Sequence, residues 1–264
     1  MHNFYKMRDA SMIELFNKIA YQYEQWRMTY PPELYKEIFS SGNEFGTVLE
    51  IGTGTGKATK IFLERGIDVT AIEPSAEMLN IACQKFSSFP NFHPLQISFE
   101  NFFDNGCRQT FDLVFAASSF QWLKGDDRLK MISALIKKGG MFARFKTITI
   151  LQSNSSADKI LDDLYRNYLP DFLPKDTAHT SFNEQIYHAA GFGQVIKKNF
   201  FRPVHFRRDD YISFSNTYTE YLSLPKNIRN DFEAAIKSSI SEKDCFHLQQ
   251  KCTLLMAHKM EEEA

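Results

Sequence analysis

A chain of 264 residues that is 43% apolar is long enough to bury one large α/β core, or a core with an inserted cap. The formal net charge of −1 gives no basic excess, so the composition argues against a nucleic-acid partner. Four scattered cysteines without a C-x-x-C pair, and the lack of a run of about 18 apolar residues, predict a cytoplasmic protein without a metal site or membrane span.

The first 45 residues predict a helical segment that precedes any strand. Apolar residues recur there at helical spacing in two groups: Met12, Leu15, Phe16 and Ile19, then Leu34, Tyr35 and Ile38 after a proline pair. A polar break at 40–43 ends the second group. We interpret residues 1–45 as an N-terminal helical lid.

Strands and helices alternate in the next part of the chain. Apolar runs predict strands at 47–51, 68–72, 92–97, 111–116 and 141–150. Helices are expected between them, over 57–64, after Ser75, and over 129–136, with a turn at 138–140. This alternation predicts a parallel sheet with right-handed crossovers.

The second half of the chain has a different pattern. It predicts, in order, a helix at 157–168, a loop at 169–180, a helix at 182–190, a strand at 194–200, a polar helical stretch at 209–246 and a last strand at 252–258. We therefore expect a core over 46–200, a helical cap insertion over 201–250, and the last core strand with a tail over 251–264.

A glycine-rich turn, Glu50-Ile51-Gly52-Thr53-Gly54-Thr55-Gly56, joins the first predicted strand to a helix. Glycines let the main chain bend tightly there and let a ligand approach it closely. A P-loop is excluded because Gly56-Lys57 is followed by Ala58 rather than by Ser or Thr. A dinucleotide fingerprint needs a third glycine where the chain has Lys57 or Thr59, which weakens an NAD site without excluding it.

The remaining pattern, E-x-G-x-G-x-G, resembles the motif of class I S-adenosylmethionine-dependent methyltransferases. The resemblance implies a Rossmann-like three-layer α/β sandwich, whose seven-stranded sheet is mostly parallel with an antiparallel last strand. It also implies S-adenosylmethionine as the cofactor. The residues of the motif that would bind it are Glu50, Gly52, Thr53, Gly54 and Gly56.

An acid at the end of the second predicted strand, Glu73, fits the same cofactor. A carboxylate at that position can accept hydrogen bonds from both ribose hydroxyls, each worth roughly 1.5–3 kcal/mol. NAD sites use such an acid too, so Glu73 does not separate the two cofactors, whereas Glu50 favours the methyltransferase.

The resemblance places further cofactor contacts along the chain. Pro74 and Met78 would flank the adenosine, Ser98 and Phe99 would contact the adenine, and the backbone of Ala116 or Ala117 would border the methionine part.

Two segments are similar to a small-molecule branch of the family that includes trans-aconitate methyltransferase. One follows the fourth strand and ends in Gln121-Trp122, where that branch commonly has His-Trp; these two residues are the catalytic candidates, and the exchange of His for Gln removes a titratable group. The other segment contains Tyr23, which can close over the cofactor, and Arg27, which can pair with a carboxylate of the cofactor or of an acidic substrate.

The predicted function is methyl transfer to a small molecule, and the branch suggests a carboxylic acid as acceptor. Alignment for in-line displacement can supply roughly 7–11 kcal/mol, and a carboxylate needs no base, so no catalytic residue is assigned. We expect no nucleic-acid, membrane or metal partner, and a monomer or homodimer. Two alternatives stay open: an NAD-dependent oxidoreductase, and a non-catalytic protein that binds S-adenosylmethionine.

Overall fold

A single sheet forms the centre of the molecule. The structure, a computed structural model, describes residues 10–42, 44–106, 109–172 and 183–260. Within these residues seven strands form one sheet in the order β3-β2-β1-β4-β5-β7-β6. Their bounds are β1 Thr47–Ile51, β2 Asp68–Ile72, β3 Phe92–Leu95, β4 Phe111–Ala117, β5 Ile136–Leu151, β6 Phe192–Arg207 and β7 Cys245–Lys259. Only β7 is antiparallel to its neighbours β5 and β6. The predicted fold class is therefore confirmed.

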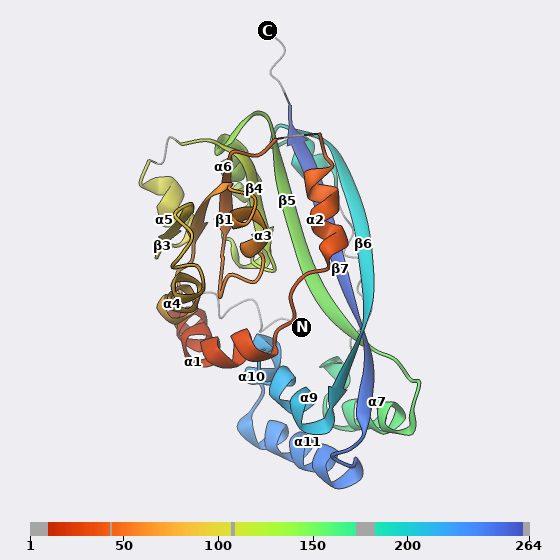
Figure 1. Ribbon diagram of the computed structural model, residues 1–264. Coiled ribbons are helices and arrows are strands. Elements are labelled where there is room, and N and C mark those ends of the chain that lie inside the picture. The colour runs from red at the N-terminus through yellow and green to blue at the C-terminus, as the bar shows by residue number, and fades with distance from the viewer. Residues whose placement is uncertain (1–9, 43, 107–108, 173–182, 261–264) are drawn as a thin grey trace.

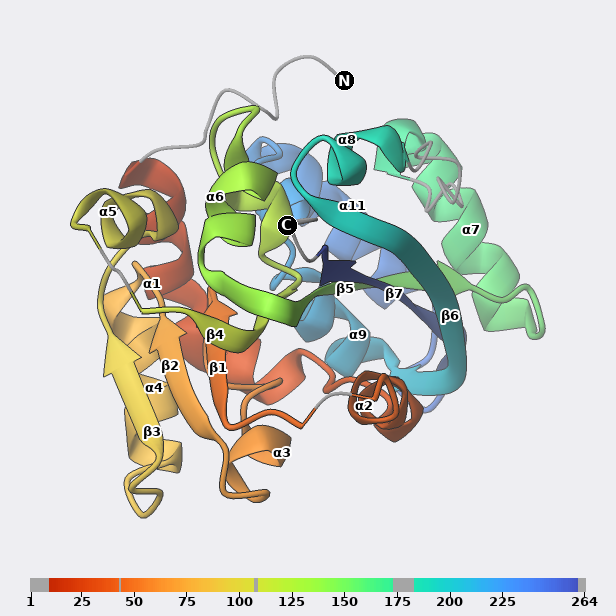
Figure 2. The same ribbon diagram turned by 90° about the horizontal axis from the view of Figure 1, so that it is seen from above.

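Helices cover both faces of the sheet (Figure 2). One face is packed by α2 (Pro32–Phe39), α3 (Lys60–Leu63) and α4 (Ala76–Lys85), and the other by α5 (Phe99–Asp104), α6 (Arg128–Ala134) and α8 (Gln185–His188). Side chains of one strand alternate between these two cores, as Val48 and Leu49 of β1 do. Because both faces are covered, the short inner strands read as nearly continuous apolar runs.

Strands β5, β6 and β7 extend well beyond the rest of the sheet (Figure 1). β4 pairs with β5 only as far as Phe145, and the remainder of β5, to Leu151, pairs with β7 alone. We call the two cores on the faces of the sheet, taken together, the core of the sheet. The overhang carries a separate apolar core, the second core, under α7 (Ser156–Tyr168), α9 (Arg208–Ser215), α10 (Thr219–Leu222) and α11 (Lys226–Ser239).

The first helix, α1 (Ala10–Trp26), bridges the two cores. Its Ile19 and Ala20 pack against Met78 and Ile81 of α4, and Leu222 of α10 joins the same cluster. Asn17 Oδ1 accepts hydrogen bonds from the Ser75 hydroxyl at 2.7 Å and from the Glu77 N–H at 3.1 Å. Among the described residues, no helix is long and apolar enough to cross a membrane.

Several element bounds differ from those predicted. β5 begins at Ile136 rather than 141, because the predicted turn at 138–140 is an irregularity within the strand: Phe111 of β4 pairs with Ile136, and Leu113 already pairs with Met141. α3 occupies only the end of the predicted helix at 57–64, and α8 only the middle of the one at 182–190, whose first residue lies outside the described residues. Most of the predicted loop at 169–180 also lies outside them. β6 and β7 are each about twice as long as predicted, because their outer halves alternate polar and apolar residues.

Candidate functional site

The glycine-rich turn lies at the carboxyl end of β1, beside the end of β2. Gly52, Gly54 and Gly56 all have positive φ, at 71°, 57° and 76°. The N–H groups of Gly52 and Thr53 donate to the Ile72 carbonyl at 2.8 and 3.1 Å, which fixes the turn against β2. A Cβ at position 52 would lie 2.6 Å from the Ser119 Cβ, whereas a Cβ at 54 would meet nothing within 4 Å. The main chain at Gly54 is therefore open to a ligand.

Glu73 sits directly beyond β2 with its carboxylate held in place by the main chain. Oε2 accepts a hydrogen bond from the Gly54 N–H and Oε1 one from the Ser75 N–H, both at 2.9 Å. The residue is only 8% exposed. Burial raises the pKa of Glu73 to about 7, and the two N–H donors act against that rise.

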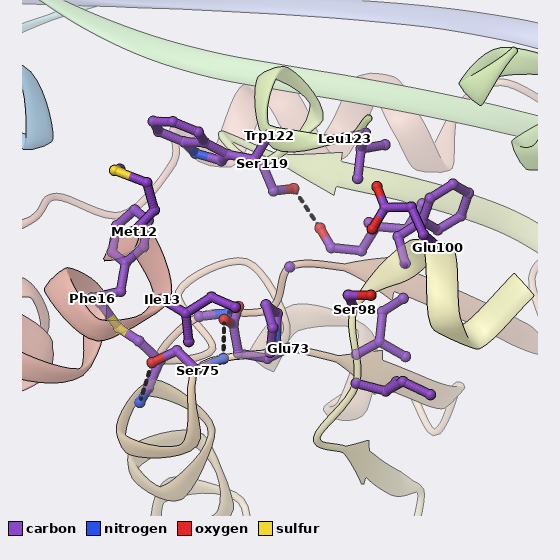
Figure 3. A pocket seen from close by; sticks show the side chains of 18 of the residues that line it. Met12, Ile13, Phe16, Glu73, Ser75, Ser98, Glu100, Ser119, Trp122 and Leu123 are labelled. Carbon is purple, nitrogen blue, oxygen red and sulfur yellow. Dashed lines mark hydrogen bonds between the residues drawn. The ribbon is translucent and has the colours of Figure 1, made fainter. Parts of the chain in front are cut away.

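A cavity of about 420 Å³ opens in front of Glu73. Figure 3 shows Met12 and Phe16 of α1 on one side of it and Ser98 and Glu100 on the other, with Trp122 facing it from the loop after β4. The predicted cofactor residues that line it are Tyr23, Gly52, Gly54, Glu73, Pro74, Met78, Ser98, Phe99 and Ala117. Residues separated by almost a hundred positions are thus brought to one cavity.

Five other predicted cofactor residues do not line this cavity: four of them lie under or behind the glycine-rich turn, and the fifth, Arg27, lines the second cavity described below. Glu50 is fully buried beneath the turn, where its Oε2 accepts a hydrogen bond from the Thr59 hydroxyl at 2.6 Å. The Thr53 and Thr59 hydroxyls lie 3.0 Å apart in the same network. Burial raises the pKa of Glu50 to about 7. Ala116 is fully buried too.

Gly56, the fourth, lets the glycine-rich turn pack closely against the end of α4. A Cβ there would lie 2.3 Å from the Phe86 ring, so the absence of a side chain lets the turn approach the end of α4. These four residues shape and support the turn from behind.

A second cavity, of about 460 Å³, lies between α1, the overhanging parts of β5 and β7, and the helices of the second core. It shares Phe16, Tyr23, Ser118 and Trp122 with the first cavity, so the two are adjacent. Both catalytic candidates line it: Gln121 borders this cavity alone, and Trp122 borders both.

Arg27 lines the second cavity and not the first. Its Nη2 donates to the Thr217 carbonyl at 2.9 Å, and its guanidinium carbon lies 3.6 Å from the centre of the Tyr218 ring. Its Nε makes no hydrogen bond with any residue that the structure describes. Arg27 therefore lies beside the second cavity and not among the residues that line the first.

Sequence reasoning missed two parts of the site. The first is Ser118, a non-glycine residue with φ of 57°, whose N–H donates to the Phe145 carbonyl at 2.7 Å and whose hydroxyl accepts from Tyr30 at 2.9 Å. No sequence signal marks such a backbone. The second is the α1 face with Met12, Ile13 and Phe16; helical periodicity identified that face but cannot distinguish a core from a cavity wall.

Comparison with known proteins gives the family. A model described as a methyltransferase domain matches residues 49–142. An uncharacterized methyltransferase of Bacillus cytotoxicus is 30% identical over 148 residues, covering 49% of this chain and 68% of the relative. A malonyl-[acyl-carrier protein] O-methyltransferase of a Marinomonas species is 36% identical over 119 residues, 40% of each chain. The chain belongs to the methyltransferase family; it spans about half the length of several other curated relatives that it matches.

Solved structures share the fold. A type II methyltransferase candidate from Anaeromyxobacter dehalogenans has a TM-score of 0.63 at 16% identity, covering 89% of this chain and 99% of that one. Haemonchus contortus phosphoethanolamine N-methyltransferase 2, solved with S-adenosylhomocysteine, has a TM-score of 0.50 at 16% identity, covering 93% and 58%.

The cofactor of the family is S-adenosylmethionine, and the first cavity fits it. The open main chain at Gly54, the fixed acceptor oxygens of Glu73 and the apolar walls of Met78 and Phe99 are the features that a nucleoside with two ribose hydroxyls requires. The chain is therefore an S-adenosylmethionine-dependent methyltransferase.

Proposed function

We propose that this enzyme binds its cofactor in the first cavity and transfers a methyl group to a small molecule bound in the second. The observation that carries the proposal is the shared wall of Phe16, Tyr23, Ser118 and Trp122, across which a donor and an acceptor can meet. The cofactor supplies a methyl group already activated by a positive sulfonium.

The chain's own residues have the task of holding and aligning the two molecules. Glu73 would accept hydrogen bonds from the ribose hydroxyls, and Ser98 would contact the adenine while Met78 and Phe99 enclose it. Tyr23 and Trp122 would border the sulfonium, where ring faces favour positive charge. α1 would keep water out from above. Catalysis would therefore come from proximity and alignment of the two molecules, without a dedicated base.

We propose a small carboxylic acid as the acceptor. Arg27 lines the second cavity, and its buried Nε, which has no hydrogen-bond partner among the described residues, would donate to a carboxylate bound there. In the reaction a carboxylate oxygen forms a bond to the methyl carbon while the bond from that carbon to sulfur breaks, and no proton has to leave. Gln121, which cannot titrate, is compatible with such an acceptor. The name of the Marinomonas relative likewise describes O-methylation.

We also propose that residues 1–45 act as a lid and residues 201–250 as a cap around a core of 46–200 and 251–264. α1 lines both cavities and α9 lines the second, so these segments would enclose the reacting groups.

Isothermal titration with S-adenosylhomocysteine, and with NAD as a control, tests the cofactor site. We expect micromolar binding of the first compound and none of the second. Glu73→Ala should weaken the binding by about 1.5–3 kcal/mol, because the two ribose hydroxyls lose their acceptor. Glu77→Ala, an exposed glutamate of α4, is the matched control and should bind normally. Unchanged affinity in Glu73→Ala would remove the ribose assignment. A screen of small carboxylic acids for methyl ester formation then tests the acceptor class.

A further inference from the structure

A single polar residue interrupts the apolar inner face of β7. Alternate residues of a strand share a face, and on this face Phe246 and Leu248 belong to the second core while Cys252 and Leu254 belong to the core of the sheet. Gln250 lies between them and is only 1% exposed. A side chain that would ordinarily be apolar is thus an amide at the boundary between two cores.

The Gln250 amide has no partner within the described parts of the chain. Neither its Oε1 nor its Nε2 forms a hydrogen bond there, although both atoms are buried. Its neighbour across the sheet, Thr149, is engaged with the Tyr218 hydroxyl at 3.1 Å. Buried polar atoms without partners are costly, so native proteins seldom keep them without a function.

Gln250 lines the second cavity, which is where a partner for the amide would lie. Two hydroxyls of the cavity wall, those of Tyr165 and Tyr211, lie 2.7 Å from each other and pair together. The amide is therefore a polar group in an aromatic environment with both a donor and an acceptor left to offer.

We propose that Gln250 selects the acceptor substrate by pairing with a neutral edge that carries a donor and a carbonyl side by side, as a carboxamide or a lactam does. This inference rests on the proposed function of the second cavity. A primary amide presents its own donor and acceptor side by side, so such an edge satisfies both atoms, and it does so whichever way the amide is turned. A carboxylate or a ketone would satisfy Nε2 only and leave Oε1 without a donor.

A second residue of the same cavity, Arg27, further defines the chemical groups that the acceptor should carry. Its unpaired Nε suits a carboxylate, whereas Gln250 suits a neutral amide. The aromatic rings that line the same cavity, including Phe214, suit a planar body. The acceptor class is therefore a small planar acid that also carries a neutral amide group.

Ligand pairs that differ in one group test the selection. With S-adenosylhomocysteine bound to the protein, the dissociation constants of 3- and 4-carbamoylbenzoate are compared with those of 3- and 4-acetylbenzoate, in which a methyl group replaces NH₂. We expect the better carbamoyl compound to bind roughly tenfold or more tightly than its acetyl counterpart, because the acetyl group leaves Oε1 unpaired. Equal affinities, or no binding of either carbamoyl compound at millimolar concentration, would overturn the proposal.

The variant Gln250→Met tests the residue itself, with Gln249→Met on the opposite face of β7 as the matched control. Methionine has a similar volume and no hydrogen-bonding amide, so Gln250→Met should lose the preference for the carbamoyl compound and should raise Tm. Gln249→Met should keep the preference. A lowered Tm together with a retained preference would show a structural role and sink the idea. Binding of S-adenosylhomocysteine should be unchanged in both variants; its absence in the parent protein would instead contradict the proposed function.

Discussion

Two carboxylates lie at the ends of neighbouring strands and have different surroundings. Glu73 faces a cavity and accepts two main-chain hydrogen bonds, whereas Glu50 is sealed under the glycine-rich turn with Thr59 as partner. Glu50 Oε1 has no hydrogen-bond partner among the described residues. A buried acid with one free oxygen is costly when ionised, so Glu50 makes the turn sensitive to pH.

We predict that Glu50→Gln makes stability less dependent on pH. Burial raises the pKa of Glu50 from 4.5 to about 7, so the folded state binds its proton more tightly than the unfolded state. Stability from this group is then greatest at low pH and is lost as pH rises from about 4.5 through 7. The advantage of the variant should grow between pH 5 and pH 8 by an amount on the order of 1–3 kcal/mol.

Urea unfolding of both proteins at the two pH values measures this difference. Glu73 titrates in both proteins, so its contribution largely cancels. An equal stability difference at pH 5 and pH 8 would mean that Glu50 does not change its protonation over this range.

At the scale of elements, one buried side chain, Asp158, hydrogen-bonds the start of α7 to the end of the sheet. Asp158 Oδ2 accepts from the Ser155 N–H at 2.9 Å and completes a capping box, while its Oδ1 accepts from the His247 N–H of β7 at 2.8 Å. The carboxylate is completely buried. It therefore fixes the start of α7 against the overhanging part of β7.

Asp158→Ala should lower the free energy of unfolding by about 2–4 kcal/mol, because buried N–H groups of both elements lose a charged acceptor. Chemical denaturation measures the loss. The control is Asp162→Ala, which removes an exposed pair with Arg166 and should cost less than about 0.5 kcal/mol. Similar losses in the two variants would contradict a special role for Asp158.

The elements also show how far sequence reasoning reaches. β1, β2 and β4 were predicted almost to the residue, since strands covered on both faces are mostly apolar runs between turns. The outer ends of β6 and β7 were not, because polar residues such as Arg202 and Gln250 alternate along them. A ligand site at the glycine-rich turn was expected for a similarly local reason, and a cavity does open beside that turn. The second cavity depends on contacts between distant segments, and no short pattern contains it.

At the scale of the whole molecule, the first cavity is lined both by α1 and by segments at the ends of the inner strands. α1 packs on α4 and also contacts Leu222 of α10. A ligand in this cavity thus contacts segments that must stay docked together. Binding of a ligand in this cavity should therefore raise the free energy of unfolding of the entire fold.

We expect S-adenosylhomocysteine at one hundred times its Kd to stabilise the protein by about 2.7 kcal/mol and to raise Tm by roughly 5–10 °C. Scanning calorimetry provides the measurement. A single transition that moves as a whole is expected. An equal shift with NAD would count against the cofactor assignment.

The overhang of β5, β6 and β7 has a consequence for how the enzyme can change over generations. Thr149 and Gln250 lie on the overhang, whereas Gly52 and Glu73 lie at the ends of strands that stop short of it. Substitutions in one region leave the hydrogen bonds of the other intact, and effects at separated sites tend to add. With the acceptor bound in the second cavity, as we propose, a lineage can explore new acceptors by remodelling the overhang while its cofactor site is inherited unchanged. A laboratory library confined to that region would sample the same freedom.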